Sequence, residues 1–313
     1  MDVIRYPDDP RPDRWRQPVL ALGNFDGVHL GHRTIVERVV RAAARRASTP
    51  VVLTFDPHPT RVLRPGAAPL LLMTSEQKVG VLGGLGVEGV AIVRFNRDVA
   101  SWNPETFVRL VLWEWLGVAE VWVGANFVFG HDRAGSVTTL RQLGSRFGFS
   151  AEAIEPVRYK EFVVSSSRAR QLIAEGRVEE AATLLGRPYV LDGIVVHGLQ
   201  RGRTLGFPTA NLDTENELLP PDGVYATLAT LDGVEYPSVT NIGVRPTFHL
   251  PSAIVVETHV LDMDRDLYGK PIRVAFVHHI RDERTFDGVE ALKAQIAADC
   301  HSARILLAKT PSF

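Results

Sequence analysis

The first part of this chain is organised around the stretch Ala21-Leu22-Gly23-Asn24-Phe25-Asp26-Gly27-Val28-His29-Leu30-Gly31-His32. An apolar run (residues 19–22) leads into a glycine-containing turn, and a segment with helical spacing follows. A strand, a tight turn and a helix N-terminus together favour anion binding, because unpaired N–H groups and the positive end of the helix dipole point the same way. His29 and His32 would add two donors on one face of that helix. The stretch therefore predicts a phosphate site.

Two simpler interpretations of the histidines remain open. Asn24, Asp26 and Gly27 are all turn formers, so the stretch could be an ordinary turn. The two histidines could also bind a metal, although no cysteine or third clustered ligand accompanies them. Because a strand precedes the motif and a helix follows it, we favour nucleotide phosphate as the ligand.

Residues 18–186 alternate short β-rich runs with helical segments. The strands are expected at residues 19–22, 51–55, 90–93, 121–123 and 151–154. Near-continuous apolar strands separated by helices predict a parallel sheet covered on both faces, a Rossmann-like α/β domain. Ligands of such sheets bind beyond the carboxyl ends of the strands. The informative polar stretches follow strands in this way, at residues 23–32, 56–59, 124–130 and 165–170.

After residue 186 the pattern changes to closely spaced β-rich runs. These are residues 189–197, 224–230, 234–239, 253–261 and 272–279, with a hairpin signal at Leu231-Asp232-Gly233. Only residues 286–307 have a helical period. We expect an antiparallel β-barrel with a terminal helix, closed so that its edges are protected. The expected division is an irregular tail at 1–16, an α/β domain at 17–186 and a β domain at 187–313.

Length and composition describe an ordinary globular protein with two domains. The chain has 313 residues, of which 45% are hydrophobic and 23% charged, with a formal net charge of -1. This charge gives no general drive toward nucleic acid or an anionic membrane, so neither is an expected partner. The single cysteine, Cys300, excludes an internal disulfide framework and is typical of the cytoplasm. No apolar run approaches membrane-spanning length.

The motifs resemble those of the bacterial bifunctional riboflavin kinase and FMN adenylyltransferase (FAD synthetase) family. The resemblance begins at Gly23-Asn24-Phe25-Asp26-Gly27-Val28-His29-Leu30-Gly31-His32 and covers about residues 18–300. It continues through residues 54–59, 124–130, 164–170, 201–212, 241–248 and 256–259. The combination is far more specific than any one of these motifs.

For the α/β domain, the resemblance implies adenylyl transfer from ATP to FMN, giving FAD and pyrophosphate. His29 and His32 would be the catalytic residues that steady the triphosphate. Further ATP contacts are implied for Gly23, Phe25, Asp26, Gly31, Ser165, Ser166, Ser167 and Arg168. The flavin side would be bordered by Asp56, Pro57, Pro59 and Asn126. Serine hydroxyls and a guanidinium suit phosphate, but an N-cap followed by solvated arginines is the simpler reading of residues 165–170.

For the β domain, the resemblance implies riboflavin kinase activity with ATP and Mg²⁺. Thr209 and Asn211, in Pro208-Thr209-Ala210-Asn211, would hold Mg²⁺ and ATP, since oxygen donors suit this ion. Gly202, Arg203 and Gly206 would complete the ATP contacts. Glu257 would be the base that accepts the proton of the riboflavin 5′-hydroxyl. The simpler alternatives are a local turn at residues 208–211 and a strand carboxylate that faces water.

Three other functions compete with a bifunctional enzyme. A kinase with an inactive first domain is opposed by the presence of His29, His32, Asn126 and Arg168. A non-enzymatic flavin or nucleotide sensor predicts loss of Glu257 or of the Thr209/Asn211 pair, and neither is lost. A transferase acting on pantetheine phosphate or glycerol phosphate would leave the β domain without a purpose. The flavin substrates and products are expected to be riboflavin, FMN and FAD.

Overall fold

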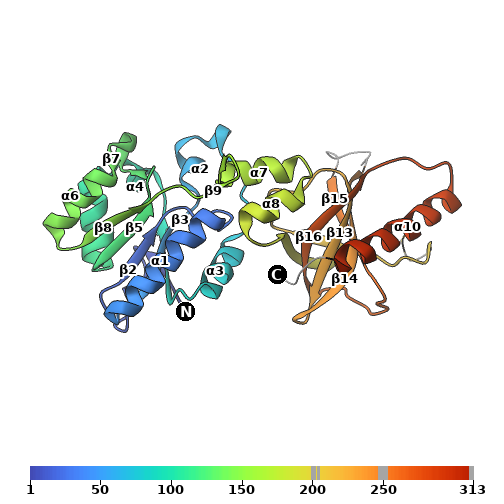
Figure 1. Cartoon of the computed structure of the whole chain (residues 1–313), viewed down its shortest axis with the longest axis horizontal. Helices are drawn as coiled ribbons and strands as arrows, with labels where there is room; N and C mark the ends of the chain where they lie inside the picture. Colours follow the sequence, from blue (N-terminus) through green and yellow to red (C-terminus); the bar gives the residue numbers. More distant parts are fainter. Residues whose placement is uncertain (199–201, 203–204, 246–252, 310–313) are drawn as a thin grey trace. The chain divides into compact units, whose positions relative to one another are not determined.

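The computed structural model describes residues 1–198, 202, 205–245 and 253–309. It divides into two compact units, Met1–Ser165 and Ser166–Phe313, called here the first and second unit (Figure 1). The expected domain boundary at residue 186 stays a prediction. Each unit is described by itself below.

The first unit contains a six-stranded sheet in the order β1-β4-β3-β2-β5-β8. Every neighbouring pair of strands in it is parallel. The strands are β1 (Asp2–Tyr6), β2 (Val19–Leu22), β3 (Pro50–Asp56), β4 (Gly89–Arg94), β5 (Glu120–Gly124) and β8 (Ser150–Ile154). The predicted parallel sheet and its five predicted strands are confirmed, and β1 is an additional strand.

Two apolar cores lie on the two faces of this sheet. Along β2, Leu20 and Leu22 belong to one core and Val19 and Ala21 to the other, as the period of two requires. One face is covered by α1 (Leu30–Arg46) and α3 (Ser75–Gly84), and the other by α5 (Pro104–Phe107), the π-helix η2 (Val108–Trp115) and α6 (Val137–Phe147) (Figure 1). All of β2 is buried, so its carboxyl end is rigidly placed.

The short elements of the first unit cluster in its loops. They are the helices α2 (Pro59–Leu63), η1 (Pro65–Ala67), α4 (Arg97–Ser101) and η3 (His131–Arg133), and the strand pairs β6 (Val128–Phe129) with β7 (Gly135–Ser136) and β9 (Arg158–Tyr159) with β10 (Phe162–Val163).

The N-terminal segment differs from the irregular tail expected at residues 1–16. Its strand β1 pairs with β4, and Ile4 is buried in the core. The indole N–H of Trp15 donates to the Asp2 carboxylate at 2.9 Å, and Trp15 is 2% exposed. The prolines and arginines of this segment obscured a strand of only five residues, which tertiary pairing stabilises.

The second unit is built on a closed barrel in the order β11-β12-β15-β14-β13-β16. Its strands are antiparallel: β11 (Tyr189–Val196), β12 (Ala210–Thr214), β13 (Gly223–Leu231), β14 (Val234–Arg245), β15 (Ala253–Val260) and β16 (Pro271–Asp282). The helices are α7 (Ser166–Ala174), α8 (Val178–Leu185) and the terminal α10 (Val289–Ala308). The predicted barrel and terminal helix are confirmed, and closure leaves no free sheet edge.

A hydrogen-bonded set of hydroxyls distinguishes the two faces of the barrel wall. Thr227 contacts Thr240 at 2.8 Å, Thr240 contacts Thr258 at 2.9 Å, and all three are at most 1% exposed. Val239, the neighbour of Thr240, packs instead in the core that includes Cys300 of α10. Thr240 and Thr258 therefore point into the barrel. Their direct neighbours along β14 and β15 point out of it. In the part of the chain that the structure describes, no helix is long and apolar enough to cross a membrane.

Candidate active sites

The turn after β2 lies where the chain order of the sheet reverses. From β2 the chain continues through β3 and β4 on one side, and then through β5 and β8 on the other. In open α/β sheets, ligands bind at such a reversal, beyond the carboxyl ends of the strands. The turn that begins at Gly23 follows β2, and Asn126 follows β5, so both lie at this edge of the sheet.

The turn has an unusual backbone. Phe25, Gly27 and Val28 have φ values of 49, 80 and 37°. Glycine adopts such values freely, but a β-branched valine at positive φ is a genuine outlier. Phe25 and Val28 are both 0% exposed, so packing holds the turn in this conformation. Strained backbone of this kind clusters at ligand sites, where the surrounding structure fixes it.

His29 and His32 lie together at the start of α1, as the sequence predicts. His29 is the N-cap, and its Nδ1 accepts the backbone N–H of His32 at 3.3 Å. The two rings stack with centroids 3.7 Å apart and an interplanar angle of 15°. Gly31 permits this, because a Cβ there would lie 3.1 Å from the His29 ring. Two imidazoles are thus fixed at the positive end of a helix dipole.

Asp26 and Asn24 tie the turn to its surroundings. The Asp26 carboxylate is 2% exposed and accepts the Leu72 N–H at 3.0 Å. The Asn24 carbonyl accepts the Thr54 hydroxyl at 2.9 Å and the Lys78 ammonium at 3.0 Å. Burial lowers the pKa of Lys78, and the charge of Asp26 opposes part of that shift. Lys78 belongs to none of the sequence motifs, and only the structure brings it to the turn.

A cleft of about 660 Å³ opens beside this turn. Its apolar wall is largely aromatic, made by Phe55, Phe95, Trp102, Phe107, Phe127 and Phe129. Polar lining residues include Asn24, Arg64, Asn126, His131 and Arg133. Flat aromatic side chains suit a planar, polycyclic ligand, and the arginines suit an anionic group on it.

The structure divides the residues expected on the flavin side. Pro59 and Asn126 line the cleft, together with Gly23. Asp56 and Pro57 are not among its lining residues, and Asp56 is exposed and accepts the Ser75 hydroxyl at 3.2 Å. Sequence reasoning missed the aromatic wall, although Phe127-Val128-Phe129 was a visible signal for part of it.

The serine–arginine element lies at the start of α7. Ser165 precedes the helix, while Ser166 and Ser167 are in its first turn. Arg168 donates from Nη1 to Gln171 Oε1 at 2.8 Å. Hydroxyls at a helix start are consistent with the expected phosphate contacts. That role stays a prediction.

The predicted kinase residues meet on one part of the barrel wall. Asn211 of β12 pairs with Glu257 of β15, and Glu257 pairs with Asn241 of β14. Directly opposed residues of an antiparallel pair point to the same face, here the outer one, because their neighbour Thr258 points into the barrel. Glu257 is half-buried, and Asn211 is 8% exposed. The register therefore places an amide and a carboxylate side by side.

Glycines before β12 allow the chain to approach Thr209 and Asn211 closely. A Cβ on Gly198 would lie 2.3 Å from the Asn211 amide, and a Cβ on Gly202 would lie 3.0 Å from the Thr209 hydroxyl. Gly206 has a φ of 88°, a conformation that favours glycine. Arg203 lies outside the described residues.

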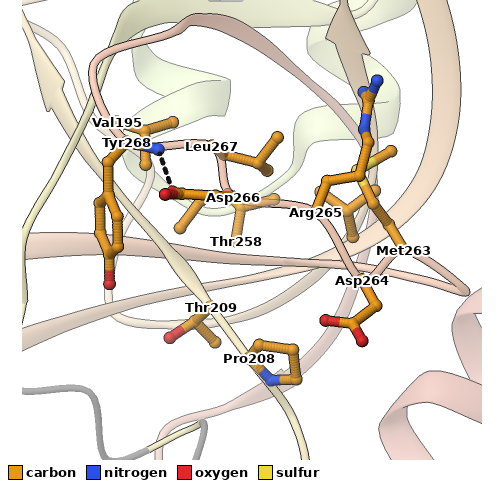
Figure 2. A pocket seen from close by; sticks show the side chains of 12 residues that line it. Val195, Pro208, Thr209, Thr258, Met263, Asp264, Arg265, Asp266, Leu267 and Tyr268 are labelled. Atoms are coloured by element: carbon orange, nitrogen blue, oxygen red, sulfur yellow. Dashed lines mark hydrogen bonds between the residues drawn. The ribbon is translucent and has the colours of Figure 1, made fainter.

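A smaller cavity of about 270 Å³ lies next to Thr209 (Figure 2). Its walls come from β11, β12, β15 and the loop of residues 263–268. In that loop the Tyr268 N–H donates to Asp266 at 3.0 Å, and the Tyr268 ring stacks on His197 with centroids 3.8 Å apart. Figure 2 shows the Thr209 hydroxyl and the Asp264 carboxylate on one side of this cavity.

The donors at this wall fit a metal ion that takes few protein ligands. Among the described residues, no group of three or more His, Cys, Asp or Glu side chains could form a closed metal cage. The hydroxyl of Thr209 and the amide oxygen of Asn211 are hard oxygen donors. Mg²⁺ accepts such a small set because it keeps waters and uses phosphate oxygens.

Comparisons with known proteins match the two parts of the chain to two different families. A family model described as FAD synthetase matches residues 11–168, and one described as riboflavin kinase matches residues 185–307. Curated relatives named bifunctional riboflavin kinase/FMN adenylyltransferase include one from Pseudomonas fluorescens, 38% identical over 98% of both chains, and one from Bacillus subtilis (strain 168), 36% identical over 96% of both. A solved structure described as a macrolide-efflux protein from Streptococcus pneumoniae has a TM-score of 0.87 and 29% identity, and the match covers 96% of this chain and 98% of that one.

Proposed function

This chain belongs to the bifunctional riboflavin kinase/FMN adenylyltransferase family, and we propose that its two reactions are divided between the two sites described above. The barrel site phosphorylates riboflavin to FMN with ATP. The site at the sheet edge transfers the adenylyl group of a second ATP to FMN, giving FAD and pyrophosphate. This chain is thus a kinase and a nucleotidyltransferase.

At the sheet edge, the residues mainly bind and orient two anions. The aromatic cleft takes the isoalloxazine ring, and Pro59 and Asn126 line it. A phosphate oxygen of FMN attacks the α-phosphorus of ATP, and the bond to pyrophosphate breaks. His29 and His32 stabilise the negative charge that develops on the phosphate oxygens, which is electrostatic catalysis.

The remaining transferase residues support this step. Gly23 leaves room for the Phe25 ring, and Gly31 leaves room for the His29 ring. Phe25 and Asp26 hold the turn in its conformation. The family resemblance supports phosphate contacts from Ser165, Ser166, Ser167 and Arg168. Asp56, at the end of β3, and Pro57 do not line the cleft, so we assign them only an indirect role in shaping its flavin side.

At the barrel site, the carboxylate of Glu257 accepts the proton of the riboflavin 5′-hydroxyl. The resulting oxygen nucleophile attacks the γ-phosphorus of ATP, and ADP leaves. Thr209 and Asn211 would hold Mg²⁺, which neutralises phosphate charge when it is bound. Gly202, Arg203 and Gly206 would complete the ATP contacts. Positioning supplies most of the catalysis in such transfers.

One observation carries the proposal: each unit holds its own cluster of candidate reactive groups. The first has two stacked histidines at a helix start beside an aromatic cleft. The second has Asn211 and Glu257 opposed on neighbouring strands. An inactive first unit would have no need to keep both histidines in place. The expected cytoplasmic location and the expected absence of nucleic-acid partners stay predictions.

The test is a product analysis. The purified protein is incubated with ATP and Mg²⁺, with either riboflavin or FMN, and the flavins are resolved by chromatography. We expect FMN and then FAD from riboflavin, FAD directly from FMN, and neither product when a chelator removes Mg²⁺. Formation of FMN alone, with added FMN left unchanged, would show that the first unit is inactive.

A further inference from the structure

Lys78 occupies a position that is unfavourable on its own. It lies in the first turn of α3, where the helix dipole repels a cation. It is half-buried, and burial lowers its pKa. A lysine kept in such a place needs a compensating interaction, and the structure shows what its ammonium contacts.

The ammonium contacts the turn that separates the aromatic cleft from α1. Lys78 Nζ donates to the Asn24 carbonyl at 3.0 Å, and the Thr54 hydroxyl donates to the same oxygen at 2.9 Å. Asn24 and Gly23 line the cleft, and His29 follows five residues after Asn24. A shift at Asn24 would therefore move the wall of the cleft and the start of the histidine motif together.

Two carboxylates also act on Lys78. The charges of Asp26 and Asp56 both favour its protonated form. Asp26 is in the turn itself, and Asp56 ends β3 and accepts the Ser75 hydroxyl from α3. Left uncompensated, two negative charges would repel the phosphates of both FMN and ATP, and this repulsion is strong where water is partly excluded.

We propose that Lys78 is a positioning residue for adenylyl transfer: its ammonium fixes the Asn24 carbonyl and offsets the negative charge of Asp26 and Asp56 beside the phosphate-binding turn. The inference rests on the proposed function of this edge of the sheet. It gives Lys78 no contact with the reacting atoms. Its effect acts through the placement of the turn and through the local charge.

The test compares three substitutions that separate charge from hydrogen bonding. Lys78→Arg keeps both, Lys78→Gln keeps an N–H donor without charge, and Lys78→Met removes both. Lys293→Met makes the same chemical change at a half-buried lysine of α10 and serves as the matched control. The kinase reaction of the same chain is the internal control for folding.

We expect Lys78→Met and Lys78→Gln to lower kcat/KM for FMN adenylylation about tenfold or more, mainly through a higher KM for FMN and ATP. Lys78→Arg should stay within about threefold of the wild type, and every variant should keep its kinase rate. Transferase activity of Lys78→Gln within twofold of the wild type would overturn the charge argument. Equal losses in both reactions, or no recovery with arginine, would reduce Lys78 to a general stabilising residue.

These results stay distinct from failure of the proposed function. If the wild type makes no FAD from FMN, the assignment of the site itself is wrong. If the wild type makes FAD and the Lys78 variants match it, only the inference about Lys78 is wrong.

Discussion

The two ring nitrogens of His29 have different tasks. Nδ1 accepts the His32 N–H and so caps α1, which requires that this nitrogen carry no proton. In the neutral ring the proton is then on Nε2, which can donate to a phosphate oxygen. Truncating His29 to alanine should therefore remove both the cap of α1 and the donor to phosphate. Another substitution can restore the cap alone.

Replacing His29 separates capping from catalysis. Asparagine is a good N-cap, so His29→Asn should keep the stability that His29→Ala loses, about 1 kcal/mol. Both variants lack the imidazole, and both should make FAD at least about 100-fold more slowly, as for loss of one electrostatic donor. FMN formation should be unchanged. FAD formation by His29→Asn near the wild-type rate would contradict the assigned role.

Replacing Glu257 tests the barrel site. Glu257→Gln keeps the size of the side chain but removes the base, so FMN formation should fall about 10²–10⁴-fold. FAD should still form from added FMN at the wild-type rate. The measurement is the initial rate of each reaction on the same preparation. A kinase rate within twofold of the wild type would show that Glu257 only faces water.

The lowered pKa of Lys78 predicts a pH dependence of stability. Between this lowered pKa and 10.5, the unfolded chain binds more protons than the folded one, so the contribution of Lys78 to stability rises with pH in that window. The stability of the wild type relative to Lys78→Met should therefore increase from neutral to alkaline pH. Denaturant unfolding at about pH 7 and about pH 10 measures this difference. An unchanged difference would contradict the burial of the ammonium.

At the scale of elements, the apolar periodicity of the sequence predicted most of the strands. Five of the six strands of the first sheet and five of the six barrel strands were visible because each is a β-rich run. The strand β12 was missed because its first residues, Ala210 and Asn211, belong to a motif that also looks like a turn. The strand β1 was missed because three prolines follow it closely. The π-helix η2 has no signature in apolar spacing, so the sequence predicted only a helical segment between the strands at residues 90–93 and 121–123.

The close approach of the segment before β12 gives a prediction at this scale. In Gly198→Ala the new Cβ would lie 2.3 Å from the Asn211 amide, so either the segment or the amide must move. Riboflavin kinase activity should fall about tenfold or more, since small displacements at such sites are costly. Adenylylation of FMN should not change. Gly66→Ala is the matched control, because its Cβ meets nothing within 4 Å, and it should leave both reactions intact.

At the scale of the whole molecule, the chain combines two folds with different kinds of site. The sequence predicted both fold classes and the motif residues at each site. It could not predict the aromatic wall of the cleft, which comes from several strand ends and loops, or the approach of Lys78 to Asn24. These depend on contacts between residues far apart in the chain, such as Asn24 and Lys78, whose residue numbers differ by 54.

The most direct test of the central claim, two separate sites in one chain, is a mixing experiment. His29→Ala and Glu257→Ala are each incubated with riboflavin, ATP and Mg²⁺, alone and together, and FAD is measured by chromatography. Alone, His29→Ala should stop at FMN, and Glu257→Ala should leave riboflavin unchanged. Mixed, they should make FAD, because FMN released by one variant is a substrate for the other. FAD formation by either variant alone at the wild-type rate, or none from the mixture, would contradict the account.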